Sequence, residues 1–207
     1  DIFLFENDQE LSFRLRYSQQ KSMNQFAGGI ENGYGRERSI RIRFRLVKEL
    51  SNQTEIILLD DDLNAVVNSN RNRKIGSTTL LSDFSYRPLR NLEVGFVLKA
   101  GESTDSFPLK PTSVTSNGQL LRLNLSFSAS GRLRLEVERN ELVANTSENF
   151  LPYELIGGNQ IGKNYFWRLN YEYRFTTNLQ TSAFYEGRQQ GGGRVIHSLK
   201  AEARAFF

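Results

Sequence analysis

The sequence predicts an all-β chain that folds as an antiparallel, up-and-down transmembrane β-barrel of about ten strands. Three observations lead to this prediction. Apolar and polar residues alternate over much of the chain, no run of 18 apolar residues could form a transmembrane helix, and aromatic residues gather near the ends of the alternating segments. We predict a single β-barrel domain spanning residues 1–207, which can be the carboxy-terminal part of a longer chain.

The alternation is clearest near the carboxy terminus. Between Trp167 and Phe175 every second residue is apolar or aromatic, and arginine, asparagine or glutamate occupies the positions between them. The last segment, 199–207, alternates in the same way. Because successive side chains of a strand point to opposite faces, both segments are expected to be strands.

The same pattern places the other strands. In chain order the predicted segments are 11–18, 40–46, 55–59, 75–86, 92–99, 121–128, 132–138, 164–175, 179–185 and 199–207. The connections alternate between short turns such as 51–53 and long loops such as 19–37, 60–74 and 101–118. Outer-membrane barrels have short turns on one side and longer loops on the other, so the pattern favours a meander without helices.

Charged residues occupy the face opposite to the apolar one. If the apolar face contacts lipid, these charges line a narrow lumen. Glu55, Glu93 and Lys99 share this face with a predicted lumen charge cluster, which consists of Arg14, Arg16, Arg41, Arg43, Arg45, Arg122, Arg132, Arg134, Glu136, Glu138, Arg168, Glu172, Arg174, Lys200, Glu202 and Arg204. Basic residues outnumber acidic ones, and unpaired buried charge is costly. Two interpretations stay open: a water-containing plug closed by salt bridges, and an anion-preferring conduit or a site for an acidic segment.

Small side chains share the predicted lipid face of the last two strands. They are Thr181, Ala183, Ala201, Ala203 and Ala205. Small residues allow close approach of another backbone inside a membrane. This docking patch predicts contact with a partner subunit or an ordered lipid, and plain lipid contact is the alternative.

Catalytic and metal-binding patterns find little support. The one histidine, His197, shares the face of Leu199 and therefore points towards lipid or the aromatic girdle. The segment 60–64 is rich in aspartate but has Ala65 where a calcium loop needs glycine. No phosphate loop, metal cluster or nucleophile elbow is found. We expect no enzymatic activity, no cofactor and no nucleic-acid partner.

The carboxy-terminal strand resembles that of bacterial outer-membrane β-barrels, because the chain ends on Phe207. In that family an aromatic last residue belongs to the signal read by the barrel assembly machinery. The apolar segment 151–158, together with 164–207, resembles the endings of large barrel-terminated surface proteins of Bacteroidota-like bacteria. The residue two positions before the end, usually aromatic, is Ala205 here. The resemblance implies a location in the outer membrane, with its lipid and the assembly machinery as partners.

The expected function is therefore that of a non-enzymatic outer-membrane barrel, acting as a membrane anchor, an anion-preferring conduit or a subunit of an envelope complex. One alternative is an outer-membrane enzyme with its active site at the rim. Another is a soluble β-sandwich binding module, which would turn the same apolar face inward.

Overall fold

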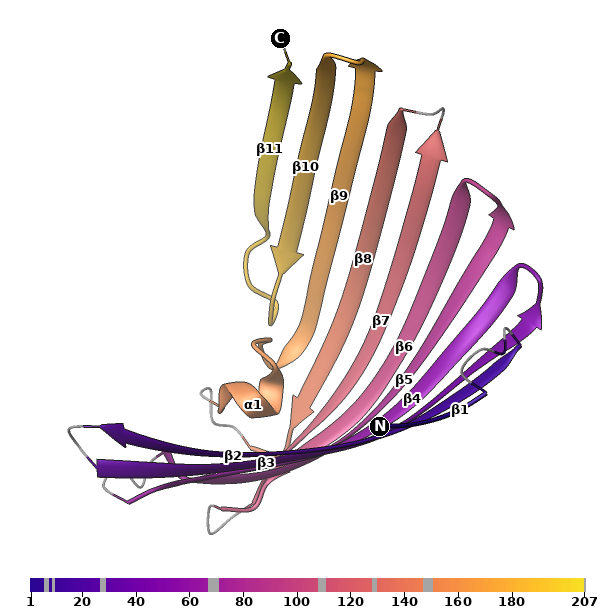
Figure 1. Cartoon of the computed structure of the whole chain (residues 1–207). Coiled ribbons are helices and arrows are strands. Elements are labelled where there is room, and N and C mark those ends of the chain that lie inside the picture. Colours follow the sequence, from indigo (N-terminus) through magenta and orange to yellow (C-terminus); the bar gives the residue numbers. More distant parts are fainter. Residues whose placement is uncertain are drawn as a thin grey trace.

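The structure, a computed structural model, is a single antiparallel sheet that curls around a short helix (Figure 1). It describes residues 1–5, 8, 10–26, 29–66, 71–107, 111–127, 130–146 and 151–206. Within these residues the strands follow one another in the sheet in the order of the sequence, from β1 to β11. The chain is therefore an up-and-down meander.

The elements have the following bounds. The strands are β1 (Ile2–Leu4), β2 (Leu11–Phe26), β3 (Gly29–Val47), β4 (Leu50–Ala65), β5 (Arg73–Leu89), β6 (Leu92–Asp105), β7 (Thr112–Phe127), β8 (Gly131–Ala144), β9 (Gly162–Thr176), β10 (Leu179–Gln189) and β11 (Ile196–Ala205). The helix α1 (Tyr153–Ile156) lies in the connection between β8 and β9.

The ten predicted strands correspond to β2–β11, but several of them are much longer than predicted. The predicted loop 19–37 is wrong, because β2 continues to Phe26 and β3 starts at Gly29. Much of 60–74 and 101–118 is also strand. In these extensions both faces are polar, so the sequence shows no alternation to mark a strand. The expectation of a chain without helices is wrong too, because of α1.

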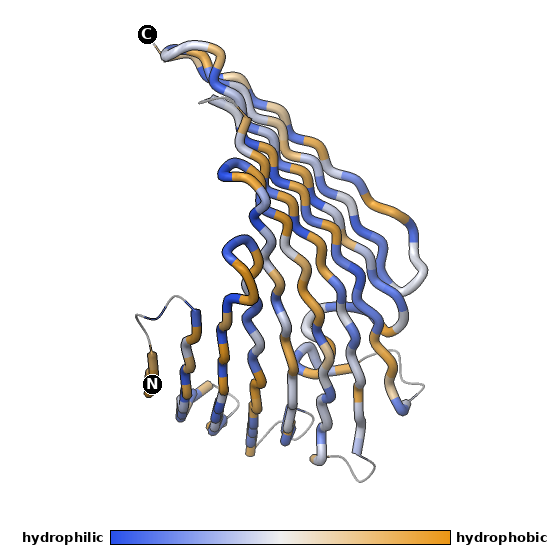
Figure 2. Tube along the Cα trace, turned by 90° about the vertical axis from the view of Figure 1, so that its right-hand side faces the viewer, coloured by the Kyte–Doolittle hydropathy of each residue, from blue (hydrophilic) through white to orange (hydrophobic). Residues whose placement is uncertain are grey.

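The register gives the sheet two chemically different faces. Leu11, Phe13 and Leu15 of β2 lie opposite Phe44, Ile42 and Ile40 of β3 on one face, which we call the outer face. The other face, which carries α1, is the inner face. Figure 2 shows the resulting alternation of hydrophobic and hydrophilic positions along the strands. A sheet with one apolar face must cover that face with protein or with lipid.

The strands are strongly staggered. From Leu11, at the start of β2, the register partners lead strand by strand through Phe44, Asn52, Phe84, Phe96, Leu121, Val137, Trp167 and Gly187 to His197. Leu11 lies at the short-turn end of the sheet, where β11 also ends, whereas His197 lies at the loop end of β11 (Figure 1). A row of register partners thus runs from the short-turn end of the sheet to the loop end. Such a stagger accompanies the tilt of the strands in a barrel.

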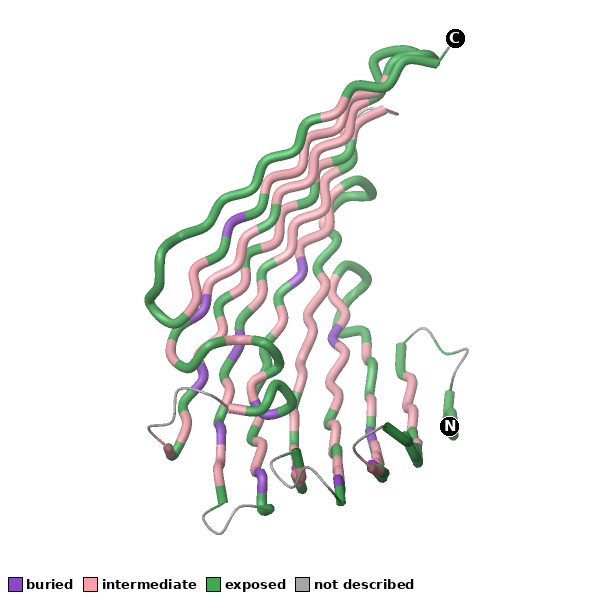
Figure 3. Tube along the Cα trace, turned by 90° about the vertical axis from the view of Figure 1, so that its left-hand side faces the viewer, coloured by how far each residue is buried: buried purple, intermediate pink, exposed green. Residues whose placement is uncertain are grey.

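The small buried core lies on the inner face near the loop end. Leu155 of α1 packs there with Ile75, Val114 and Leu142, all of them buried. Figure 3 shows most of the buried positions in the lower part of the sheet, towards the loops. Many large apolar side chains of the outer face are exposed, so this core does not cover them.

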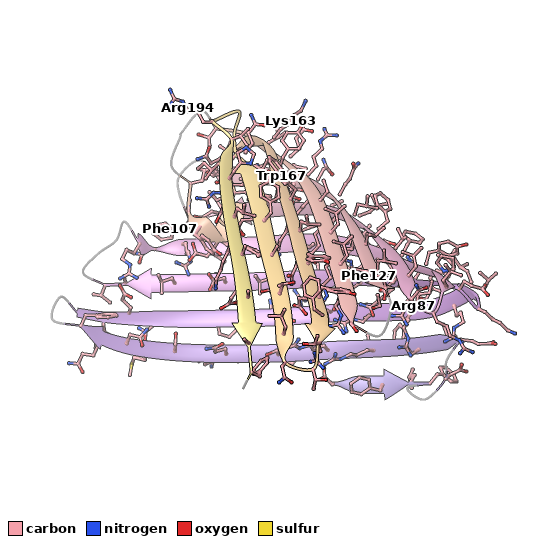
Figure 4. All side chains as sticks on the ribbon, turned by 90° about the horizontal axis from the view of Figure 1, so that it is seen from above. Arg87, Phe107, Phe127, Lys163, Trp167 and Arg194 are labelled. Atoms are coloured by element: carbon pink, nitrogen blue, oxygen red, sulfur yellow. The ribbon has the colours of Figure 1, made fainter. Side chains whose placement is uncertain are left out.

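Aromatic rings border the apolar part of the outer face. Phe127 stacks on Tyr171 at the short-turn end, with 5.9 Å between ring centroids, and Trp167 lies 5.8 Å from the His197 ring towards the loop end. Figure 4, a view from above, labels Phe127 and Trp167. Ten residues separate Tyr165 from Phe175 along β9. At a rise of about 3.3 Å and a tilt of about 40°, this corresponds to about 25 Å, the height of the apolar band of an outer-membrane barrel.

Charged residues replace apolar ones on the outer face beyond this band. Asp60 of β4 receives hydrogen bonds from Arg36, at 2.9 Å, and from Arg38, at 3.2 Å. The hydrogen bond and the charge of Asp60 raise the pKa of the Arg36 guanidinium further above its ordinary value. Arg139 pairs with Glu141 in the same zone of β8. The strands therefore continue beyond the apolar band on the loop side.

β1 and β11 are the two edges of the sheet, and no ladder joins them in the part of the chain that the structure describes. In a meander of eleven strands the first and last run in the same direction. β2 and β11 run in opposite directions, so β2–β11 supply the even number of strands that an antiparallel barrel needs to close. β1 adds three residues to the edge of β2.

The two faces predict different tolerance of charge. Leu123 lies on the outer face of β7 and Asn124 on its inner face. Arginine on the lipid side of a barrel costs about 2–4 kcal/mol at the bilayer midplane. We expect Leu123→Arg to prevent folding into lipid vesicles and Asn124→Arg to be mild, as measured by heat-modifiable migration in detergent electrophoresis. Equal folding of the two variants would contradict this assignment of faces.

Candidate functional site on the inner face

Every residue of the predicted lumen charge cluster lies on the inner face, as the register shows. Across β7–β10, Arg122 lies opposite Glu136, Glu136 opposite Arg168, and Arg168 opposite Glu186. The Arg168 Nη1 atom lies 3.1 Å from Glu136 Oε2. Opposite charges in directly opposed positions stabilise antiparallel strands, and this row has alternating sign along its length.

Arg122 and Arg41 also make close contacts with carboxylates from other strands. Arg122 Nη2 lies 2.7 Å from both oxygens of Asp83. Arg41 donates from Nε and Nη2 to Glu55 Oε2, at 3.0 and 2.8 Å. The predicted cluster had omitted the carboxylates of this face that lie in poorly alternating or extended parts of strands, namely Glu31, Glu37, Asp61, Asp83, Asp105 and Glu186. The positive excess of the inner face is therefore smaller than the sequence suggested.

Some inner-face cations nevertheless have no carboxylate within 4 Å among the described residues. They are Arg43, Lys99, Arg132, Arg134, Arg174, Arg188 and Lys200. Most of them lie near the short-turn end, where β3 ends, β8 begins and β9 and β11 end. Positive charge is therefore concentrated at that end of the inner face.

A groove of about 430 Å³ crosses β7–β11 on the same face. Its wall combines the apolar side chains of Leu120, Phe166 and Ile196 with the charged groups of Glu138 and Arg188. Phe166 is one of the aromatic residues near the strand ends, but it lies opposite Glu138 and Arg188 and so points inward, away from the outer face.

The connection between β8 and β9 folds back onto the inner face. Leu155 fills the apolar site formed by Ile75, Val114 and Leu142. Glu154 receives a salt bridge from Arg73, with 2.9 Å between Nη2 and Oε1, and the Nε of the same arginine lies 2.9 Å from Asp61. The apolar segment 151–158, which stood out in the sequence, is thus docked on the charged face.

Two local features fix the path of this connection. Gly157 ends α1 with φ of +58°, a left-handed conformation that favours glycine. Asn164 at the start of β9 is fully buried and donates to the carbonyl oxygens of Gln160, at 2.7 Å, and Gly162, at 3.1 Å. The segment therefore returns to the sheet at a defined point and narrows the loop end of the inner face.

The outer face carries one polar cluster that the sequence analysis did not single out. Asn52 is buried there and donates to Ser82 Oγ at 2.9 Å, while Thr54 donates to Asn52 Oδ1 at 2.8 Å. The three side chains satisfy one another, which reduces the cost of placing polar groups on an apolar face.

The remaining predicted sites fall as follows. In the docking patch, Thr181 lies opposite Ala203 and Ala183 opposite Ala201 on the outer face, and the role of the patch stays a prediction. His197 also lies on the outer face, 2.8 Å from the Tyr185 hydroxyl.

Asp60 and Asp61 lie in β4 and pair with arginines, so they do not form the solvated loop that the sequence suggested. Phe207, the predicted assembly signal, lies outside the described residues.

Neither a metal site nor a membrane-spanning helix is found in the described part of the chain. No three of its histidine, aspartate and glutamate side chains are grouped to hold a metal ion. The helix α1 is too short to cross a membrane.

Comparisons with known proteins identify the class of fold. No family profile matches the chain, and no curated protein matches its sequence. Its structure is similar to that of OmpT, an outer membrane protein of Vibrio cholerae, with a TM-score of 0.58 and 9% identity over 95% of this chain and 76% of that chain. The translocator domain of the autotransporter NalP from Neisseria meningitidis gives a TM-score of 0.40 at 13% identity, over 98% of this chain and 79% of that chain. A Pseudomonas aeruginosa FadL homologue gives 0.34 at 10% identity, over 95% and 73%.

The first of these likenesses, together with the meander, shows that the chain has the fold of a bacterial outer-membrane β-barrel. The predicted fold class is confirmed. At 9% identity the likeness concerns the fold alone. The resemblance to surface proteins of Bacteroidota-like bacteria, and the absence of enzymatic activity, stay predictions.

The docking of α1 can be tested with matched substitutions. Removing a buried leucine side chain costs about 2–5 kcal/mol, and a buried unpaired carboxylate would add to this cost. We expect Leu155→Asp to release the segment 151–161 and to increase its cleavage by proteinase K at least about ten-fold. The control is Tyr153→Asp, because Tyr153 is 70% exposed and its substitution should leave cleavage nearly unchanged. Similar cleavage of both variants, mapped by mass spectrometry, would contradict the docking.

Proposed function

We propose that the protein is an integral outer-membrane β-barrel whose charged inner face lines an anion-preferring pathway across the bacterial outer membrane. The proposal depends on the inner-face cations without carboxylate partners, which include Arg132, Arg134 and Arg174 near the short-turn end. Rings of arginine in a pore favour anions. Where carboxylates pair with arginines, as in the row that contains Glu136, they balance the local charge.

The distribution of charge differs between the two ends of the proposed pathway. Paired carboxylates such as Glu31 and Asp61 lie towards the loop end, where α1 also narrows the inner face. Unpaired cations gather at the short-turn end, which is the periplasmic side in outer-membrane barrels. An anion that enters at the loop end would therefore meet nearly balanced charge there and positive charge at the short-turn end. A cation would be repelled by the positive charge at the short-turn end.

The proposed setting is the lipid of the outer membrane, with a narrow pathway inside the barrel. The outer face supplies an apolar band of about 25 Å for the lipid of the outer membrane. The barrel assembly machinery is the proposed route into that membrane. A barrel of about ten strands is mostly filled by its own side chains, so a conducting pathway would be narrow and would carry small ions.

Reversal potentials in a salt gradient test the proposal. In planar bilayers with potassium chloride, we expect the protein to be more permeable to chloride than to potassium. The triple variant Arg132→Glu, Arg134→Glu, Arg174→Glu should lose this preference, because it reverses the charge at the short-turn end.

Arg139→Glu is the matched control, since Arg139 lies on the outer face of β8 and pairs with Glu141 beyond the apolar band. It should retain the selectivity of the parent. Cation preference of the parent protein would overturn the proposal. A complete lack of conductance from folded protein would also overturn it, and would leave the salt-bridged plug.

A further inference from the structure

A small pocket on the inner face of β1–β4 brings three arginines together. It has a volume of about 190 Å³, and its wall includes Arg14, Arg41 and Arg43, with Ser12 and Gln53 beside them. The register places Arg14 directly opposite Arg41, and Arg43 lies two residues further along β3. Like charges in directly opposed positions of neighbouring strands destabilise a sheet unless negative charge is supplied.

Two carboxylates supply part of that charge. Asp1 lies next to β1, and its Oδ2 is 2.9 Å from Arg14 Nη2, while the ring of Phe3 lies 5.0 Å below the Arg14 guanidinium. Glu55 is the partner of Arg41. Against three arginines these two carboxylates leave one positive charge at the pocket.

Several donors at the pocket also have no acceptor. Arg14 Nε is buried and makes no hydrogen bond, the one such side-chain atom found among the described residues. The side chains of Ser12, Arg43 and Gln53 make no hydrogen bond or ion pair within the described part of the chain. A buried donor without a partner costs about 1–3 kcal/mol, so its presence here needs an explanation.

We infer that this pocket binds a phosphate group. The unsatisfied donors come from β2, β3 and β4, and they exceed what the two oxygens of a single carboxylate need. A phosphate offers more acceptor oxygens, and guanidinium groups bind it through two parallel hydrogen bonds. The volume exceeds that of a phosphate, so the pocket admits a phosphate together with part of the molecule that carries it.

The pocket goes beyond the proposed pathway, because binding there needs no conductance. It lies beside the edge strand β1, and its wall comes from β1–β4 and not from the strands that carry Arg132, Arg134 and Arg174. The phosphate has two possible sources: a soluble phosphate compound that enters the barrel, or the headgroup of a phospholipid that reaches the edge of the sheet at β1.

Calorimetric titration of the folded protein in a phosphate-free, non-ionic detergent tests the inference. Inorganic phosphate is the first probe, dihexanoyl phosphatidylglycerol the second and acetate the third. We expect phosphate or the lipid to bind at least ten-fold more tightly than acetate. Stronger binding of inorganic phosphate would indicate the soluble source, and stronger binding of the short lipid the headgroup.

Arg43→Gln and Ser12→Ala remove donors from the pocket and should weaken binding of the preferred probe, the arginine variant at least ten-fold. The matched control is Arg134→Gln, because Arg134 shares the inner face and also has no carboxylate partner. It should change binding less than two-fold. Heat-modifiable migration checks that each variant is folded, and Ser12→Ala is the milder change if Arg43→Gln fails to fold. No phosphate or lipid binding by the parent, equal binding of acetate, or an equal loss in Arg134→Gln would overturn the inference.

Discussion

The register between neighbouring strands is the constraint on which the other features of this barrel depend. Because side chains alternate along a strand, a slip of one residue between β2 and β3 would turn Arg41 and Arg43 towards the lipid and Ile42 towards the interior. Each arginine moved to the lipid side would cost about 2–4 kcal/mol near the midplane. Inside a bilayer, the backbone has no other partners than those of the adjacent strands. Register therefore fixes the backbone, the lipid contact and the charge of the interior at the same time.

The inner face has an apolar packed region, a region of paired charges and a region of excess positive charge. At the loop end, Leu155 and its apolar neighbours form the one buried cluster among the described residues, and the Arg73 salt bridges flank it. In the middle, the row through Glu136 and Arg168 joins adjacent strands by opposite charges. Towards the short turns, positive charge is in excess. The inner face thus changes from a packed region to a balanced one and then to a positive one along the barrel axis.

The sequence predicted the membrane-facing parts of the strands because only there do apolar and polar residues alternate. Beyond the apolar band, Arg38 and Asp60 face outward while Glu37 and Asp61 face inward, so period-two alternation disappears although the strands continue. The predicted charge face could be read from strands such as β3 for the same reason. Asp83 was missed because it lies in a stretch of β5 where neighbouring residues on both faces are of similar polarity.

Other features could not be predicted because they depend on contacts distant in the sequence. The segment 151–158 is visibly apolar, but its destination is set by Ile75 and Val114, which lie about 80 and 40 residues earlier. The three-residue strand β1 has too short a pattern to be recognised, and pairing with β2 is what defines it. The arginine pocket needs the register of β2 against β3, which the separate strand patterns do not contain.

The stagger of the strands has an electrical consequence. Arg122, Glu136, Arg168 and Glu186 are successive neighbours across β7–β10, but each step along this row also moves along the barrel axis. The row therefore follows a helical path of alternating charge on the inner face, and its members lie at different depths in an electric field applied across the membrane. A unit charge that crosses the whole field gains about 2.3 kcal/mol per 100 mV, and one at an intermediate depth gains a fraction of this. An anion held beside Arg122 and one held beside Arg168 would therefore sit at different electrical distances, and voltage would expel them to different extents.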